Sequence, residues 1–392
     1  MSNVQVNGIT LEYESFGPED RETILLIMGL GAQLTQWPLP LCEALVARGY
    51  RVIRFDNRDA GLSTKFERGQ FAPLPAAFAG FMTGKTPFVP YTLYDMVDDT
   101  VGLLDALGID RAHIVGSSMG GMIAQLIASE YPERTLSLTS IMSTSGNALL
   151  PPPKPRVMKL FVSPAPPAHN MEAIIERGIA TYRTIGSPAW PTGEATLREW
   201  VTRDAMRSYC PSGVVRQAAA AMTNGDRRPK LRRISVPTVV LHGDADPLVP
   251  VEGGRDTAAN IPGAELRIVE GMGHDIPLQL VDTFADAIVS AAERATGSKE
   301  PLLLSAPDHP VAEEAPPLRE LSAEALGEGD IDTLSPAVQE LPPEPQPQPQ
   351  PQDEPQDEPA AEIPVIAGVQ TPAGFSARIF SRVKGWFARG GR

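Results

Sequence analysis

Short apolar stretches alternate with amphipathic segments along most of the chain. The apolar stretches have the length of strands, and the amphipathic segments carry apolar positions at helical spacing. The strands predicted in this way are residues 24–27, 51–55, 111–115, 136–142, 238–243 and 265–269. The predicted helices between them include residues 37–48, 93–107 and 119–131. This alternation predicts an α/β fold with a mostly parallel central sheet that helices cover on both faces.

Residues 145–233 interrupt the alternation and are too long for a connection without structure of its own. Helical spacing at 171–184 and 195–206 predicts a helical cap inserted after the sixth strand. A cap above the sheet would form an apolar pocket, which predicts a ligand with a sizeable apolar part. Alternatively, its aromatic side chains only hold the cap to the core: Phe161, Tyr182, Trp190, Trp200 and Tyr209. The phenylalanines between residues 65 and 90 could extend the same wall: Phe66, Phe71, Phe78, Phe81 and Phe88.

The composition changes after residue 297. Residues 299–370 hold sixteen Asp and Glu against two Lys and Arg, a net charge of −14 that equals the formal charge of the whole chain. Residues 298–371 are also rich in Pro and Gln, with too little apolar surface to offset the entropy of ordering. They predict a disordered acidic linker behind a folded domain of residues 1–297, so the acidity says little about the substrate.

Residues 372–392 reverse the sign of the charge and predict a basic amphipathic helix. Between residues 375 and 389, Phe, Ile, Val and Trp recur near helical spacing, and Arg and Lys fill much of the rest. This pattern suits an anionic membrane surface, to which one short helix would bind weakly and reversibly. A groove on a protein partner is the second interpretation, and folding back onto the acidic linker is the third. Nucleic acid is not an expected partner, since the folded domain has no basic stripe.

The start of the chain and its cysteines indicate the compartment. No basic region followed by an apolar run precedes residues 4–13, which instead predict a hairpin around the turn dipeptide Asn7-Gly8. No stretch approaches the ~20 apolar residues that span a bilayer. Cys42 and Cys210 form no disulfide framework or metal motif and are interpreted as reduced core thiols. We therefore expect a cytoplasmic protein without bound metal, with peripheral membrane association through its C-terminal helix as an open alternative.

Residues 116–120 read Gly-Ser-Ser-Met-Gly, a Gly-x-Ser-x-Gly motif between a predicted strand and a predicted helix. A serine at such a sharp strand-to-helix turn has its hydroxyl lifted out of the sheet toward a cleft. The motif alone is weak, but within a strand–turn–helix it nominates Ser118 as a nucleophile. A serine hydroxyl needs a base, and the base needs an orienting acid.

The two later strands supply both partners in the order acid, then histidine. Residues 238–243 lead into Asp244 and Asp246, and residues 265–269 lead into His274. Both loops follow carboxyl ends of strands, where open α/β sheets place their sites. Asp246 is favoured over Asp244, which lies nearer the strand and suits a turn former. Asp275 is a weak candidate because it would point away from the adjacent His274.

The remaining histidines are weaker candidates for the base. His113 opens a buried strand and suits a packed or capping role, whereas His242 ends a strand near the predicted site. His169 lies in a Pro-rich stretch and His309 in the predicted linker. His274 alone lies in a Gly-x-Gly-His turn that must expose it.

A serine nucleophile of this kind also needs hydrogen-bond donors for the oxyanion. The backbone N–H of Met119 follows the nucleophile at the start of a helix whose dipole helps. The second donor should come from a loop after an early strand, and Leu30 in the loop of residues 28–31 is our candidate. The alternative interpretation of this loop is a tight turn with no further role.

These motifs together resemble the α/β-hydrolase superfamily over residues 24–295, and within it bacterial esterases of the aclacinomycin methylesterase type and lipase-like enzymes. The matching segments are residues 28–31, 56–63, 116–120, 243–246 and 271–274. The resemblance implies a triad of Ser118, Asp246 and His274 and hydrolysis of a carboxylic ester without a cofactor. Many relatives carry His where this chain has Met28, and serine rather than aspartate at position 118 argues against dehalogenase or epoxide hydrolase chemistry.

The sequence therefore predicts a serine esterase that acts on a small-molecule ester with an apolar group. A lactonase, an amidase or a hydrolase of carbon–carbon bonds would use the same triad. A different class is a ligand receptor or scaffold tethered by its C-terminal helix. Residues 56–63 are interpreted as an ordered turn held by Arg58, in preference to a catalytic role.

Overall fold

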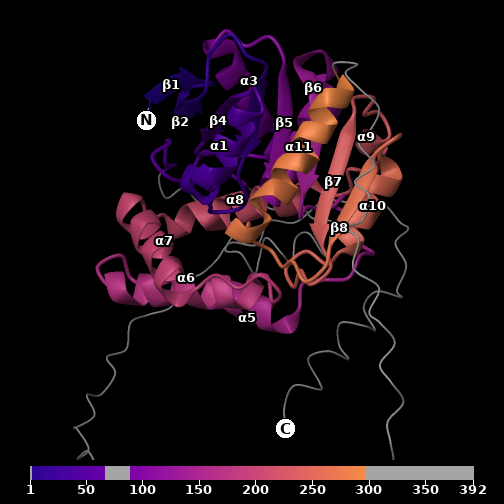
Figure 1. Ribbon diagram of the computed structural model, residues 1–392. Coiled ribbons are helices and arrows are strands. Elements are labelled where there is room, and N and C mark those ends of the chain that lie inside the picture. The colour runs from indigo at the N-terminus through magenta and orange to yellow at the C-terminus, as the bar shows by residue number, and fades with distance from the viewer. Residues whose placement is uncertain (1, 67–88, 296–392) are drawn as a thin grey trace, which may run out of the picture. The chain divides into compact units, whose positions relative to one another are not determined.

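The computed structural model describes residues 2–66 and 89–295, which form a sheet flanked by helices (Figure 1). The eight strands lie in the order β1-β2-β4-β3-β5-β6-β7-β8. β1 pairs antiparallel with β2 and β2 with β4, and the other five pairings are parallel. The strands are β1 (Ser2–Val6), β2 (Ile9–Phe16), β3 (Thr23–Ile27), β4 (Arg51–Phe55), β5 (Ala112–Ser117), β6 (Thr135–Ile141), β7 (Thr238–Gly243) and β8 (Glu265–Val269).

The predicted hairpin between β1 and β2 is present. Asn7 and Gly8 join the strands with φ values of 45° and 75°. Two successive positive φ values are what a type I′ turn requires, and Asn-Gly is the dipeptide that adopts them most readily. Local turn chemistry therefore determines this antiparallel edge of the otherwise parallel sheet.

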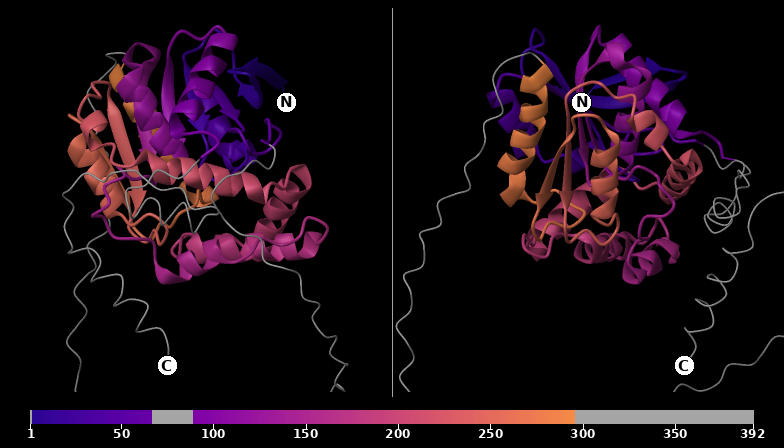
Figure 2. Two further views of the ribbon diagram at one scale, coloured as in Figure 1. Left: turned by 180° about the vertical axis from the view of Figure 1, so that it is seen from behind. Right: turned by 90° about the vertical axis from the view of Figure 1, so that its right-hand side faces the viewer.

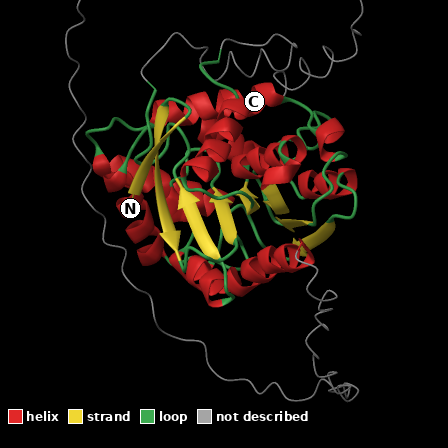
Figure 3. Ribbon diagram, turned by 90° about the horizontal axis from the view of Figure 1, so that it is seen from above, coloured by secondary structure: helices red, strands yellow, loops and turns green. Residues whose placement is uncertain are grey.

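Helices cover both faces of the sheet (Figures 2 and 3). One face packs against α1 (Leu39–Ala47) and α11 (Val281–Ala295), whose buried side chains share a core with β3 and β7. The other face packs against α3 (Leu93–Ala106) and α4 (Met119–Glu130), with α10 (Glu252–Asn260) beside β7 and β8. Among the described residues, short 3₁₀ helices also lie in the connections, at Leu34–Gln36, Pro132–Arg134 and Leu278–Leu280. The arrangement confirms the predicted fold class.

Four helices between β6 and β7 form what we call the cap: α5 (Pro155–Val162), α6 (Met171–Ile185), α7 (Glu194–Arg207) and α8 (Pro211–Asn224). The short helix α9 (Arg228–Leu231) leads back to the sheet. Figure 1 shows α5, α6 and α7 across the end of the sheet to which the β7 and β8 arrows point. The cap thus lies at the carboxyl ends of the parallel strands, where the sequence places its candidate site residues.

Helices α6 and α7 have a small apolar core of their own, built from Ile175, Ile179, Leu197 and Val201. Tyr182 and Trp200 pack against it, and Trp190 packs instead against the core of the main sheet. These three aromatic side chains therefore hold the cap together and onto the sheet, which is the structural role that the sequence left open for them.

Several predictions concern residues outside the described part of the chain. They are the linker of residues 298–371, the helix of residues 372–392, His309, and the phenylalanines at 71, 78, 81 and 88. Over residues 2–66 and 89–295, no helix has both the length and the apolar character needed to cross a membrane. Cys42 is buried and Cys210 half-buried, and both are free thiols.

Candidate active site

Ser118 lies at the sharp turn between β5 and α4, as the motif predicts. Its backbone adopts φ 56° and ψ −118°, a conformation that L-residues rarely adopt and that is held only by its surroundings. The Ser118 N–H donates to the carbonyl of Ile141 at 2.9 Å, and the Ser143 hydroxyl donates to the carbonyl of Ser118 at 2.8 Å. The neighbouring strand β6 and the segment after it therefore lock the strained turn.

The two motif glycines allow close backbone packing around this turn. A Cβ atom on Gly116 would lie 2.1 Å from the carbonyl oxygen of Gly120. A Cβ atom on Gly120 would lie 2.1 Å from the carbonyl oxygen of Ile27 in β3. Both contacts are with backbone atoms that cannot move aside, so these positions admit only glycine.

The structure brings Ser118, His274 and Asp246 into one chain of hydrogen bonds. His274 Nδ1 lies 2.6 Å from Asp246 Oδ2, and His274 Nε2 lies 3.0 Å from Ser118 Oγ. A carboxylate can only accept, so Nδ1 carries the proton and Nε2 presents its lone pair to the serine hydroxyl. The arrangement is the one in which an imidazole can take a proton from a serine.

Asp246 is fixed on both of its carboxylate oxygens. Its Oδ1 accepts from the N–H groups of Leu248 and Val249, each at 2.8 Å, which leaves Oδ2 directed at His274. Burial by itself raises the pKa of this carboxyl. The neighbouring His274 and His242 together lower the pKa by more than burial raises it, so it lies well below its usual value. The group is therefore ionised at neutral pH and able to stabilise an imidazolium.

His242 also approaches Asp246. Its Nε2 lies 2.8 Å from the carbonyl oxygen of Val249 and 3.6 Å from Asp246 Oδ2. The ring fits only because residue 254 is glycine, whose Cβ would lie 2.5 Å from His242 Nδ1. His242 thus supports the loop that carries Asp246. His113, in contrast, is buried at the start of β5, where it contacts Ser137 and Glu22, and His169 is exposed in the cap.

The two other candidate carboxylates have separate partners. Asp244 accepts from the N–H of Gly271 at 2.7 Å and steadies the loop before His274, as a turn former would. Asp275 accepts a hydrogen bond from the Ser187 hydroxyl, which belongs to the cap. Burial raises the pKa of Asp275 to about 6, despite the opposing effects of that hydrogen bond and of nearby His274.

Cap residues hold the loop of His274 by three hydrogen bonds to backbone groups of that loop. The His274 N–H donates to the carbonyl of Ile185 at 2.7 Å, and the Gly273 N–H donates to Ser187 Oγ at 2.8 Å. The Ala189 N–H donates to the carbonyl of Gly271 at 3.2 Å. No local sequence pattern marks Ser187 as part of the site, because its partners lie 86 and 88 positions away.

The two predicted oxyanion donors belong to segments that adjoin Ser118. Met119 is the first residue of α4, and residues 29–32 form a turn closed by the Ala32 N–H on the carbonyl of Gly29 at 3.2 Å. A Cβ on Gly29 would lie 3.0 Å from the Cβ of Ser118, so this turn packs directly against the serine. Within the described residues, the N–H groups of Leu30 and Met119 have no hydrogen-bond partner.

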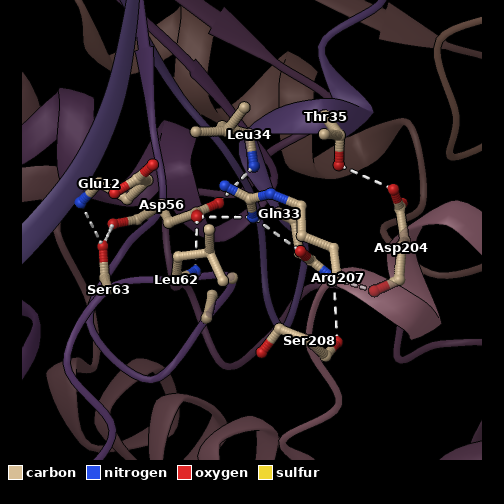
Figure 4. Close-up of polar contacts among 12 residues, drawn as sticks. Glu12, Gln33, Leu34, Thr35, Asp56, Leu62, Ser63, Asp204, Arg207 and Ser208 are labelled. Atoms are coloured by element: carbon tan, nitrogen blue, oxygen red, sulfur yellow. Dashed lines mark hydrogen bonds and ion pairs between the residues drawn. The ribbon is translucent and has the colours of Figure 1, made fainter. Parts of the chain in front are cut away.

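The turn of residues 56–63 is an ordered structural element with buried ion pairs. Arg58 binds both carboxylate oxygens of Asp99 in α3, at 2.6 and 2.7 Å, and so ties the turn to that helix. Asp56 accepts from the N–H groups of Leu34 and Leu62 and pairs with Arg207 of the cap at 2.7 Å (Figure 4). None of these groups contacts Ser118 or His274 among the described residues, which fits a turn better than a catalytic role.

No metal or cofactor is assigned to this region. Over residues 2–66 and 89–295, no three side chains of His, Cys, Asp or Glu are grouped as metal ligands would be. The polar groups near Ser118 are instead engaged with one another or directed at the serine. What the arrangement can do chemically is to activate a serine hydroxyl beside two free backbone donors.

Residues 22–279 match the family described as the alpha/beta hydrolase fold. Rhodomycin D methylesterase DauP from Streptomyces sp. strain C5 is 28% identical over 308 residues, which cover 74% of this chain and 96% of that protein. A putative carbamate hydrolase, RutD from Caulobacter sp. strain K31, is 27% identical and covers 74% and 97% of the two chains.

Solved structures agree on the fold. The enol-lactonase from Burkholderia xenovorans LB400 superposes with a TM-score of 0.57 at 23% identity, covering 74% of this chain and 99% of its own. The names of these relatives are thus those of a methylesterase, a putative carbamate hydrolase and an enol-lactonase. The family match spans more than half of the chain, and the sheet order and strand–serine–helix turn agree with it. This chain is a member of the α/β-hydrolase family.

Proposed function

We propose that this protein is a serine hydrolase that cleaves carboxylic esters with a sizeable apolar group. The observation that carries the proposal is the pair of hydrogen bonds made by His274, to Asp246 at 2.6 Å and to Ser118 at 3.0 Å. The similarity to proteins named as methylesterases supports an ester as the substrate. The apolar group remains the expectation drawn from the sequence, because the side chains of Leu30 and Met119 next to the serine pack into the apolar core.

In the proposed reaction, Ser118 Oγ attacks the ester carbonyl while its proton passes to His274 Nε2. Asp246 keeps the Nδ1 proton of His274 in place and stabilises the imidazolium that forms. His274 then returns the proton to the leaving alcohol, and an acyl-enzyme remains on Ser118. Water attacks this ester with His274 again acting as the base, which releases the acid and restores the serine.

The negative oxygen of each tetrahedral intermediate would lie between the N–H groups of Leu30 and Met119. Met119 begins α4, so its N–H adds the favourable end of the helix dipole. Removing one such donor from an oxyanion site typically costs ~10²–10³ in kcat. These donors belong to the backbone, so substitution of a side chain at either position would act only by moving the turn.

Cleavage of a lactone or a carbamate is the second candidate function. The similarity to an enol-lactonase and to putative carbamate hydrolases favours it. Both substrates pass through the same kind of tetrahedral intermediate at a carbonyl carbon, so the same serine, histidine and donors would serve. What differs is the leaving group, which the three hydrogen-bonded residues do not distinguish.

The test is the hydrolysis of p-nitrophenyl butyrate by the purified full chain beside its Ser118→Ala variant. Loss of a nucleophile that acts with a base and an acid should lower kcat by several orders of magnitude. Ser117→Ala is the matched control, because Ser117 is the adjacent buried serine and has no hydrogen bond to His274 among the described residues. It should keep turnover within a few-fold of the unmodified protein.

Two results would contradict the proposal in different ways. Turnover that survives in Ser118→Ala would show that this serine is not the nucleophile. Absence of ester turnover in the unmodified protein, together with Ser118-dependent opening of an enol-lactone or cleavage of an aryl carbamate, would keep the residues but replace the substrate class.

A further inference from the structure

Helix α8 of the cap covers the turn that carries Leu30. Gln217 of α8 is fully buried, and its Oε1 accepts from the N–H of Gly31 at 2.7 Å. Its Nε2 donates to the carbonyl of Arg58, also at 2.7 Å. One side-chain amide thus bridges the turn beside Ser118 and the ordered turn of residues 56–63.

The orientation of this amide is determined by its partners. A backbone N–H can only donate and a backbone carbonyl can only accept, so Oε1 must face Gly31 and Nε2 must face Arg58. A rotated amide would lose both hydrogen bonds at once. The carbonyl of Arg58 is in turn held in place, because the Arg58 side chain binds Asp99.

The contact is made at the peptide group that sets the conformation of the turn. Gly31 has φ 68°, the left-handed value that a type II turn requires of its third residue. In such a turn the central peptide group can rotate at little cost unless one of its polar atoms is held. The N–H of that peptide group is the one bound by Gln217. Val214, one helical turn before Gln217, closes the space beside Gly31, where a Cβ would lie 2.8 Å from Val214 Cγ2.

We propose that Gln217 is a positioning residue for the oxyanion site. It holds the turn of residues 29–32 in the conformation that directs the Leu30 N–H toward the oxygen that becomes negative on attack by Ser118. This inference rests on the proposed serine hydrolase function. Among the described residues, the side chain of Gln217 hydrogen-bonds to Gly31 and Arg58 and not to Ser118 or His274, so it acts through the turn.

The variant that tests this role is Gln217→Met, which has a similar size and shape but neither accepts from Gly31 nor donates to Arg58. Thr223→Val is the control on the same helix, because among the described residues its hydroxyl binds only the helix carbonyls of Ala219 and Ala220. Active sites in each preparation are counted by labelling with an alkyl fluorophosphonate, so that any loss of folded protein is separated from a change in rate.

Three measurements are made on each full-length protein. The first is kcat and KM for p-nitrophenyl butyrate. The second is the inhibition constant of an alkyl trifluoromethyl ketone, whose carbonyl oxygen becomes an oxyanion when the serine adds to it. The third is hydrogen–deuterium exchange of peptides that cover residues 28–34, which does not require catalysis.

For Gln217→Met we expect kcat per labelled site to fall by ~10–100-fold, while KM stays within about 3-fold of the unmodified protein. This fall in kcat is smaller than the fall that removal of a complete oxyanion donor causes. The inhibition constant of the ketone should rise by about the factor by which kcat/KM falls, since both report binding of the oxyanion. Exchange in residues 28–34 should become faster, and Thr223→Val should change none of the three.

Unchanged exchange in residues 28–34, or unchanged kcat and ketone inhibition per labelled site, would overturn the role of Gln217. A rise in KM alone would also overturn it, because that would indicate substrate binding. If the unmodified protein neither turns over the ester nor reacts with the fluorophosphonate, the proposed function fails. The exchange measurement then still decides whether Gln217 orders the turn.

Discussion

The backbone N–H of His274 donates to the carbonyl oxygen of Ile185, the last residue of cap helix α6, at 2.7 Å. The candidate base is therefore held partly by the cap and not by the sheet alone. The turn of Leu30 is held by the cap as well, through Gln217 of α8. Substitutions in the cap should consequently change catalytic rates as well as substrate selection. A cap that only enclosed the substrate would affect substrate selection alone.

Ser187→Ala should weaken the junction between the cap and the loop of His274. The change removes the hydroxyl that accepts from the Gly273 N–H and donates to buried Asp275. A buried group left without its partner typically costs ~1–3 kcal/mol of unfolding free energy. Because the ionised carboxylate needs the hydroxyl more than the neutral acid does, the loss should be larger at pH 7.5 than at pH 5. Urea unfolding at both pH values measures the loss, with Ser163→Ala as the control, because the Ser163 hydroxyl donates to the carbonyl of Lys159 within its own helix turn. An equal loss at both pH values would contradict the role of Asp275.

Asp275→Asn should stabilise the protein near neutral pH. Burial raises the pKa of Asp275 to about 6, whereas an unperturbed Asp titrates near pH ~3.9. A raised folded-state pKa contributes stability that is fully present below about pH 4 and is lost as the pH rises through about 6. The asparagine lacks this loss, so the variant should gain ~1–3 kcal/mol over the unmodified protein at pH 7.5 and almost nothing at pH 4.

The measurement is the free energy of unfolding as a function of pH from 4 to 8. Asp244→Asn serves as the control, because Asp244 is exposed and lies on the neighbouring loop. A gain that is independent of pH would show that the effect comes from packing and not from the titration of Asp275.

Arg216→Met should strongly destabilise the fold. Arg216 of α8 binds both oxygens of Asp59 at 2.7 Å, and both side chains are fully buried. Removing one partner of a buried ion pair leaves an uncompensated charge and typically costs ~3–5 kcal/mol. The double variant with Asp59→Asn should lose less stability than the sum of the two single changes, because both changes break the same ion pair. Asparagine is used because it tolerates the positive φ of 68° at position 59.

Urea denaturation of the four proteins in this double-mutant cycle measures the coupling. Arg228→Met is the control, because Arg228 forms its ion pair with Asp226 near the surface and should contribute nothing measurable. Strictly additive losses for Arg216 and Asp59 would mean that the two groups do not support each other.

Gly120→Ala should abolish activity by disrupting the turn at Ser118. The added Cβ would lie 2.1 Å from the carbonyl oxygen of Ile27, so β3 and α4 would have to separate. Gly193→Ala is the matched control, since nothing lies within 4 Å of the corresponding Cβ. Soluble expression, thermal unfolding and ester turnover should be lost together in the first variant and retained in the second. A fully active Gly120→Ala protein would show that the packing at this turn is looser than described.

Removal of residues 298–392 should leave turnover of a soluble ester within about 2-fold, because every residue proposed for the chemistry lies between residues 28 and 275. Binding to vesicles that contain anionic lipid should disappear with the same truncation if the basic segment is a membrane tether. A large loss of turnover would instead make the C-terminal segment part of the catalytic unit. If replacement of Trp386 and Phe387 leaves vesicle binding unchanged, insertion of apolar side chains into the membrane is excluded.

The sequence by itself determined the sheet, its helical layers and the position of Ser118. The predicted ranges 51–55, 238–243 and 265–269 are strands with those same bounds in the structure, and Asn7-Gly8 closes the expected hairpin. These features follow from apolar periodicity and turn chemistry, which act over a few residues and can therefore be deduced locally.

Only the tertiary structure decided which polar groups meet. It placed Asp246, which the sequence favoured over Asp244, on His274, and it introduced Ser187, Gln217 and Arg216, which no motif marks. Gln217 lies 186 positions from Gly31, and Arg216 lies 157 positions from Asp59. Local patterns set where each strand and helix runs, but a buried hydrogen bond forms only where packing brings a donor and an acceptor together. Such pairs are therefore decided by how the cap folds onto the sheet.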